Sequence, residues 1–165
     1  MWAVALTVPI LNAADLGMYA YDYMELNHAA QTGAQAAFKL CNPAMGNYLP
    51  AATKCPNVLS TVTTAAQSTS LGSKVIIGTF SQEGNFCQNG SSLHLVGTSG
   101  TLSPALAPVA PSPNDCTTID PSMSYAPSDY VEVIVRYTYT PVFGGVSIGS
   151  LLPSPIKQTA WMRLQ

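Results

Sequence analysis

The stretch that decides the fold is residues 15–41, with the sequence DLGMYAYDYMELNHAAQTGAQAAFKLC. Its apolar and small residues recur at alternating steps of three and four, which is the spacing of one helix face. They are Leu16, Tyr19, Tyr23, Leu26, Ala30, Gly33, Ala37 and Leu40. Polar residues recur in the same way on the opposite face: Asp22, Glu25, His28, Thr32, Gln35 and Lys39. The segment is therefore predicted to be an amphipathic helix with one face for packing.

Residues 1–14 continue this helix upstream without a charged residue. Asp15 ends the apolar run short of the roughly 20 residues that a spanning helix needs. The run is therefore interpreted as the remaining half of a membrane helix, in which Pro9 removes one backbone hydrogen bond and can produce a kink. We expect one long helix over residues 1–40, with an apolar half (1–14) and an amphipathic half (15–40), followed by a globular head over residues 41–165.

The strand signals lie in the second half of the chain. Residues 130–140 alternate strictly, with Val131, Val133 and Val135 on one face, and residues 156–164 alternate in the same way. These two segments are predicted to pair as an antiparallel hairpin whose apolar face covers the amphipathic helix. The pattern indicates an α+β domain, a long N-terminal helix on a small antiparallel sheet.

Weaker signals fill the middle of the chain. A short helix is predicted between Pro56 and Gly72, with Pro56 at its first position and Gly72 as its stop. Residues 74–80 and 92–96 are predicted strands, and the Gly- and Asn-containing segment between them is interpreted as a long hairpin connection. The proline-rich residues 97–115 are predicted to form an extended loop.

The four cysteines, Cys41, Cys55, Cys87 and Cys116, lack a CxxC pair and have no histidine close by in sequence, which argues against zinc. An even count in a small, charge-poor chain favours two disulfides and an oxidising compartment. Of the three possible pairings we favour Cys41 with Cys55 and Cys87 with Cys116, because each closes a loop rich in Pro, Gly, Asn and Ser. Four buried free thiols are the alternative.

Composition narrows the function classes. Charged residues make up 8% of the chain, against about 25% in ordinary soluble proteins. The six lysines and arginines are scattered singly, so no basic stripe for nucleic acid is present. Two histidines and eight carboxylates stand in no recognisable catalytic spacing, and no Gly-x-Ser-x-Gly elbow occurs. We therefore expect a non-catalytic protein without a cofactor, a metal or a small-molecule substrate.

Four features have both a functional and a structural interpretation. His28 beside Glu25 could be a proton-switched contact, although a solvated helical residue is the simpler interpretation. Asp115, Asp120 and Asp129 could gather around calcium but lack EF-hand spacing, so turn and cap roles are favoured. Asn89-Gly90-Ser91 fits the glycosylation pattern and also a tight turn. The tyrosines at 19, 21 and 23 suit a membrane interface or packing between subunits.

The N-terminal motifs carry a resemblance to a known family. They are Pro9-Ile10-Leu11, then Ala14-Asp15-Leu16-Gly17 and Tyr19-Ala20-Tyr21, followed by the Ala-rich run from Leu26 to Ala37. Together they resemble the N-terminal region of TadE-like pilus proteins, the minor pilins or pseudopilins of the tight-adherence branch of bacterial type IV pili. The similarity covers about the first 40 residues. The Tyr-rich strand and the Ala-Trp-Met-Arg-Leu ending are similar to that family as well.

The resemblance implies a type IV pilin-like fold with a disulfide-stabilised head and a structural role in pilus assembly and surface adhesion. The implied partners are other pilin subunits and the inner membrane, before display on the cell surface. The implied assembly interface is Leu6, Pro9, Asp15, Gly17, Tyr19, Tyr21, Ala29, Ala30 and Gly33. Asp15 is expected to pair with a cation of a neighbouring subunit, so that Asp15→Ala leaves the head folded.

Two expectations complete the sequence-based interpretation. Family members carry a basic segment, a small residue and a glutamate upstream of the proline matched by Pro9, so we expect the natural reading frame to extend upstream of Met1. The alternative function is a membrane-anchored periplasmic or extracellular binding module, whose sheet and proline-rich loop present a ligand surface. The acid at position 15 favours the pilin interpretation, because a simple anchor has no need of a carboxylate there.

Overall fold

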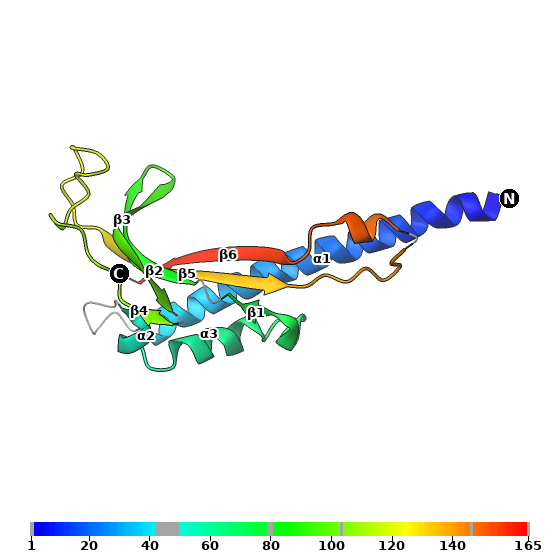
Figure 1. Ribbon diagram of the computed structural model, residues 1–165, viewed down its shortest axis with the longest axis horizontal. Helices are drawn as coiled ribbons and strands as arrows, with labels where there is room; N and C mark the ends of the chain where they lie inside the picture. The colour runs from blue at the N-terminus through cyan, green and yellow to red at the C-terminus, as the bar shows by residue number, and fades with distance from the viewer. Residues whose placement is uncertain (1, 42–49, 79–80, 103, 146, 165) are drawn as a thin grey trace.

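A long helix lies against an antiparallel sheet in the computed structural model, which describes residues 2–41, 50–78, 81–102, 104–145 and 147–164. Helix α1 (Trp2–Leu40) runs through Pro9 as one element. Its C-terminal part is covered by the sheet and by a second helix, while its N-terminal end extends beyond the rest of the molecule (Figure 1). The predicted α+β arrangement of a long helix on an antiparallel sheet is confirmed.

The six-stranded sheet is organised around β5 (Ser128–Tyr137). Strand β6 (Ile156–Arg163) pairs along one edge of β5, from Tyr137 opposite Ile156 to Tyr130 opposite Arg163. Strands β1 (Ile76–Ile77) and β2 (Gln82–Asn89) pair with β5 in turn along the other edge. Strands β3 (Ser92–Leu102) and β4 (Ala105–Leu106) follow outward from β2. The predicted pairing of residues 130–140 with residues 156–164 is therefore present. Val131, Val133 and Val135 lie on the same side of the sheet, as predicted.

The core forms where the small-residue face of α1 meets the valines of β5. Val131, Val133 and Val135 are completely buried, as are Ala29 and Ala30 of the helix. Helix α3 (Val58–Ala66) packs on the other side of this face. At Gly33 the fit is so close that an added Cβ would lie 3.3 Å from methyl groups of both Val133 and Val62.

The smaller elements close the ends of this core. They are α2 (Ala51–Lys54), the 3-10 turn η2 (Gly72–Lys74) and the 3-10 turn η3 (Ile148–Leu151). Helix α3 begins after Asn57, whose φ is 63°, and ends before Gly72, so the predicted helix is present but shorter than its sequence limits. Its first residue is Val58, two residues after Pro56.

The helix face differs from the predicted one in its N-terminal half. Leu26, Gly33 and Ala37 are buried as expected, but Leu16 and Tyr23 are 42% and 47% exposed. Asp22, predicted to face solvent, is only 8% exposed. The cause is that the end of β5 and the loop after it lie over this half of α1, where the Tyr137 side chain and the Val142 backbone donate hydrogen bonds to Asp22 and Asp15.

The hairpin connection predicted between residues 80 and 92 is a strand instead. Strand β2 fills it, and the turn to β3 is confined to Asn89–Ser92, with φ of 60° at Gly90. The register with β3 shifts between Glu83 and Asn85. The sequence of β2 does not alternate between apolar and polar residues. Because β2 pairs with both β3 and β5, several of its buried positions are occupied by small and polar residues. The extended loop predicted for residues 97–115 is present only in part, because β3 continues to Leu102 and β4 occupies residues 105–106. Val109 bridges back to Thr98 of β3.

Both predicted disulfides are formed. Cys41–Cys55 joins the end of α1 to the turn before α3, with a Cα separation of 5.3 Å. Cys87–Cys116 joins β2 to the loop before β5, with a Cα separation of 5.7 Å. The first bridge holds the two helices of the core together, and the second fixes the distal loop of the head.

Glu83 is a carboxyl group in the interior of the head. It is completely buried, and its Oε2 accepts a hydrogen bond from the backbone N–H of Ala51 at 2.6 Å. Its pKa is raised to about 7, chiefly by burial; the Ala51 hydrogen bond lowers the pKa and the charge of Asp129 raises it. The Oε1 atom has no hydrogen-bond partner among the described residues. In the folded state the protonated form is therefore favoured below about pH 7.

The close fit at Gly33 predicts a strong effect of added volume. Gly33→Leu is expected to lower the free energy of unfolding by about 1–3 kcal/mol or more, because Val133 and Val62 leave no room for the side chain. Gly17→Ala is the matched control, since a Cβ at Gly17 meets nothing within 4 Å. That change is expected to raise stability by up to about 1 kcal/mol through helix propensity. Urea unfolding of both variants checks the pair, and equal stability of Gly33→Leu and wild type would contradict the packing.

The buried position of Glu83 predicts a pH dependence of stability. Its folded pKa lies above the ordinary value of 4.5, so its contribution is complete below about pH 4.5 and is lost as the pH rises through about 7. The loss amounts to about 3 kcal/mol. Glu83→Gln is expected to flatten the fall in unfolding free energy between pH 5 and pH 8, measured by urea denaturation. Parallel curves for the variant and wild type would rule out this role.

Candidate assembly interface

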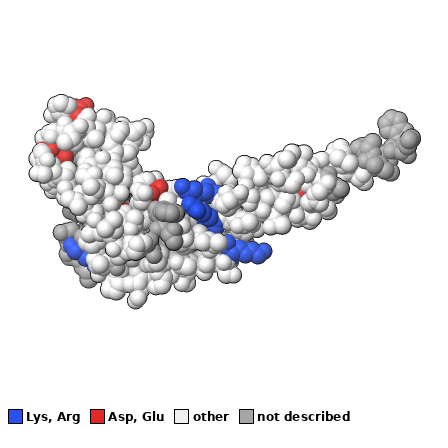
Figure 2. All heavy atoms as spheres, in the orientation of Figure 1, with Lys and Arg blue, Asp and Glu red and all other residues white. Residues whose placement is uncertain are grey.

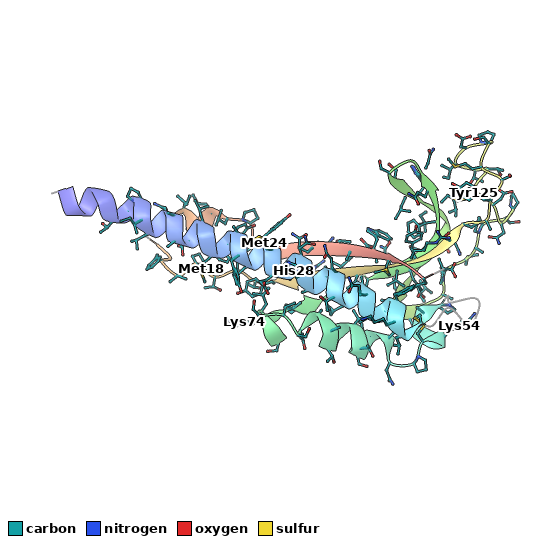
Figure 3. All side chains as sticks on the ribbon, turned by 180° about the vertical axis from the view of Figure 1, so that it is seen from behind. Met18, Met24, His28, Lys54, Lys74 and Tyr125 are labelled. Atoms are coloured by element: carbon teal, nitrogen blue, oxygen red, sulfur yellow. A yellow bond between two sulfur atoms is a disulfide. The ribbon has the colours of Figure 1, made fainter. Side chains whose placement is uncertain are left out.

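The N-terminal half of α1 exposes a large apolar surface. The exposed large side chains on it are Val8, Ile10, Leu16, Met18, Tyr21, Tyr23 and Met24. Between them lie the exposed small residues Ala13, Ala14, Gly17 and Ala20. Ile10 and Met24 are the most open, at 65% and 56%. We call this surface, from Val8 to Met24, the stem face; Met18 and Met24 project from it in Figure 3.

Charge is almost absent from the stem. In Figure 2 the Lys and Arg side chains gather over the middle of the molecule, while the projecting part of the helix shows hardly any coloured atoms. An apolar patch of this extent is unusual on a monomer and marks a surface that contacts other molecules. No helix in the described chain is long and apolar enough to cross a membrane.

Asp15 lies on the covered side of the stem and is completely buried. Its carboxylate accepts hydrogen bonds from the backbone N–H groups of Val142, at 3.0 Å, and Phe143, at 3.4 Å, and from the Ser147 hydroxyl. A Cβ at Gly149 would lie 2.7 Å from Asp15 Oδ2, so the absence of a side chain there allows this contact. The carboxylate therefore organises the loop between β5 and η3 against the helix.

Neighbouring contacts fasten the same loop to α1. Asn12 Oδ1 accepts from the Ile148 N–H at 2.6 Å, and the Tyr139 hydroxyl donates to the backbone carbonyl of Asp15 at 2.9 Å. Tyr19 packs edge-on against Tyr139, with 5.1 Å between ring centroids, and its hydroxyl donates to the Pro153 carbonyl at 3.3 Å. These contacts cover one side of the N-terminal half of α1 with residues of the same chain. The stem face is the side that stays exposed.

A second set of polar contacts, around Asp22 and Glu25, lies about two to three helical turns after Asp15. Burial raises the pKa of Asp22, while a hydrogen bond from Tyr137 and the charge of Lys74 lower it. The Ser70 hydroxyl donates to Glu25 Oε2 at 2.6 Å and holds the pKa of that carboxyl below its ordinary value. The Tyr21 hydroxyl contacts Ser70 as well, at 3.2 Å. These contacts tie α1 to β5 and to the turn after α3.

The structure divides the predicted interface residues into two groups. Pro9, Gly17 and Tyr21 are exposed and belong to the stem face. Asp15, Ala29, Ala30 and Gly33 are buried within their own chain, and Tyr19 is partly buried there. The side chain of Leu6 lies outside the described residues.

This grouping corrects two expectations. The close approach that the small residues permit is made by α3 and β5 of the same chain. The carboxylate of Asp15 is enclosed by its own loop, and no cation of another subunit is needed to satisfy it.

The other candidate groups stay apart. Asp115 and Asp120 cap turns, accepting hydrogen bonds from Thr117 and Ser122, and Asp129 accepts from Asn85 at 2.8 Å. Among the described residues, no three His, Cys, Asp or Glu side chains gather closely enough to hold a metal ion. His28 is exposed on α1.

Sequence patterning missed the buried acids. Asp15, Asp22, Glu83 and Asp129 are all buried, and their hydrogen-bond donors come from segments far away in the chain. The sequence around Asp15, for example, does not indicate which loop will cover its carboxylate.

The chain matches no family model, no curated protein and no solved structure. The function therefore has to be argued from the stem face and the head themselves.

The Asp15 contacts predict a loss of stability on substitution. Asp15→Ala removes the acceptor of the Val142 and Phe143 N–H groups and is expected to lower the free energy of unfolding by about 3 kcal/mol. Asp120→Ala is the control, because Asp120 is a partly exposed turn residue whose donors come from the nearby Ser122, and its loss should cost less than about 1 kcal/mol. Urea denaturation measures both. A stability of Asp15→Ala equal to that of wild type would show that the loop does not depend on this carboxylate.

Proposed function

We propose that this protein is a minor pilin or pseudopilin of a Tad-type type IV pilus, a non-catalytic structural subunit that takes part in pilus assembly and surface adhesion. In this proposal the N-terminal half of α1 is held at the inner membrane before assembly and then against helices of other pilin subunits. The head, stabilised by its two disulfides, faces outward on the cell surface. The observation that carries the proposal is the stem face.

The stem face supports assembly through its chemistry and its position. Its side chains are apolar or small, and they project from a helix that extends beyond the head. Burial of apolar area gives roughly 25 cal/mol per Å², so contacts along several helical turns would provide substantial free energy. The small residues Ala13, Gly17 and Ala20 would let a second helix approach closely.

The attachment of the stem to the head supports the same proposal. Asp15, Asn12 and Tyr19 hold the loop between β5 and β6 on one side of the helix. The head is therefore connected to the stem by contacts as well as by the chain. A subunit built in this way would place its head in a defined orientation once its stem is packed.

The alternative is a membrane-anchored binding module, in which the stem serves only as an attachment. A polar and aromatic pocket in the head favours this second candidate and is described below. The two proposals differ in what the stem contacts, because an anchor needs only a lipid environment whereas a pilin needs specific helix partners.

The stem face predicts an assembly defect without a folding defect. Ile10→Glu places a charge at the most exposed large apolar residue of the stem face, where the folded monomer is expected to tolerate it. In a packed interface an unpaired carboxylate costs several kcal/mol, so surface pili should fall by at least about tenfold. Electron microscopy of the organism that carries the gene counts the pili, and circular dichroism melting checks the fold.

Val109→Glu is the matched control, since Val109 is 61% exposed but lies in the head. It is expected to leave the number of pili unchanged. Normal piliation with Ile10→Glu, or after deletion of the whole gene, would contradict the assembly role. Loss of membrane association with unchanged piliation would favour the binding module.

A further inference from the structure

The head contains a pocket on the sheet face that points away from α1. It has a volume of about 420 Å³, within the range of roughly 300–1,000 Å³ that small-molecule sites occupy. Its lining includes Phe86 and Gln88 of β2, Tyr125, and Tyr130 of β5 and Arg163 of β6. Tyr130 alternates with the core residue Val131, which places the pocket opposite the helix.

The walls of the pocket are held in place before any ligand binds. The Cys87–Cys116 disulfide joins β2 to the loop that carries Tyr125, and the Cys116 N–H donates to the Tyr125 carbonyl at 3.1 Å. The Tyr125 hydroxyl donates to the Gln88 carbonyl at 2.7 Å. Because these pocket residues are already ordered, little conformational entropy is lost when a ligand binds. This favours specific over non-specific binding.

Aromatic rings form one side of the site. Phe86 stands edge-on to Tyr130 and to Trp161, with ring centroids 5.8 Å and 5.0 Å apart. Phe86 and Tyr130 are nearly buried, whereas Tyr125 is 47% exposed and lies at the far end of the head from the stem (Figure 3). Trp161 is 40% exposed but does not line the pocket, so the exposed aromatic ring of the lining is that of Tyr125, and it offers a flat apolar surface beside polar groups.

The charge of the site comes from Arg163. Among the described residues that line the pocket, Arg163 alone is charged. Its guanidinium has five N–H donors in a planar fork, so it can bind a carboxylate of a ligand while keeping an interaction within its own chain. Ser128 and Gln88 also line the pocket and add a hydroxyl and an amide group, and the Gln88 amide nitrogen donates to the Gly90 carbonyl at 3.1 Å.

We propose that this pocket binds an acidic saccharide residue, a hexuronic acid or a sugar of similar charge. The pyranose ring lies against Tyr125, its carboxylate meets Arg163, and its hydroxyl groups bond with Ser128 and Gln88. A ring with apolar C–H faces, hydroxyl edges and one carboxylate fits this combination. An extended peptide would instead need a row of unpaired backbone groups. The inference goes beyond the assembly proposal and does not depend on the stem.

The test titrates the full chain with sodium D-glucuronate, followed by NMR chemical shifts of the protein. D-glucose is the neutral control, and sodium acetate is the control for a carboxylate alone. We expect saturable binding of glucuronate with a dissociation constant on the order of 1 mM, and shifts centred on Tyr125, Ser128 and Arg163. Glucose and acetate are expected to bind about tenfold more weakly or worse.

Substitutions separate the two recognition elements. Arg163→Gln is expected to weaken glucuronate binding about tenfold or more, the loss of a charge-assisted hydrogen-bonded pair. Tyr125→Leu is expected to weaken it about threefold to tenfold. Lys157→Gln is the control, because Lys157 is a cation at the opposite end of the same strand, and it should leave binding unchanged.

Several results would overturn the proposal. They are the absence of saturation, equal binding of acetate and glucuronate, unchanged binding in Arg163→Gln, and shifts centred on the stem. The wild-type shift map remains informative even where a variant fails to fold. If Ile10→Glu binds glucuronate normally but loses its pili, both the assembly proposal and the saccharide proposal are supported. If Ile10→Glu has normal pili, only the assembly proposal is overturned.

Discussion

The packing of a small-residue helix face against a valine-rich strand is the constraint on which the rest of the structure depends. A Cβ added at Gly33 would lie 3.3 Å from Val133 of β5 and from Val62 of α3, closer than ordinary van der Waals contact. Since protein interiors are close-packed, this fit sets how near the helix lies to both elements. The Cys41–Cys55 bridge then holds the end of α1 beside α3, and the remaining strands extend the sheet from β5.

A second constraint follows from the few charges that the chain contains. Four of its eight carboxylates, Asp15, Asp22, Glu83 and Asp129, are buried. A buried carboxylate is costly unless it receives hydrogen bonds or a proton. Asp15 receives donors from a single loop, and burial raises the pKa of Glu83 to about 7, so that it is protonated in more acidic solution. The carboxylates therefore fasten segments that apolar contact alone does not hold.

These constraints leave two surfaces open at opposite ends of the molecule. The stem face is apolar and extends along the helix, which suits contact with other helices. The pocket in the head is small, aromatic and cationic, which suits a soluble ligand. The core lies between the two ends. In the proposed function, the subunit would assemble through the stem face while the pocket meets the surroundings.

The sequence by itself determined the elements with strong local periodicity. The long helix, the hairpin of residues 130–140 and 156–164, and both disulfides follow from spacing, alternation and cysteine parity. The tertiary structure alone decided what covers each helix residue. Leu16 and Tyr23 became exposed and Asp22 became buried, because Tyr137 of β5 and the loop after β5 lie on the side of the helix that carries Asp22 and Asp15. Strand β2 was hidden for a similar reason, since its place between β3 and β5 comes from distant partners. Asp15 shows the limit most clearly: its charge was visible in the sequence, but the donors from Val142, Phe143 and Ser147 meet it only after the chain has folded.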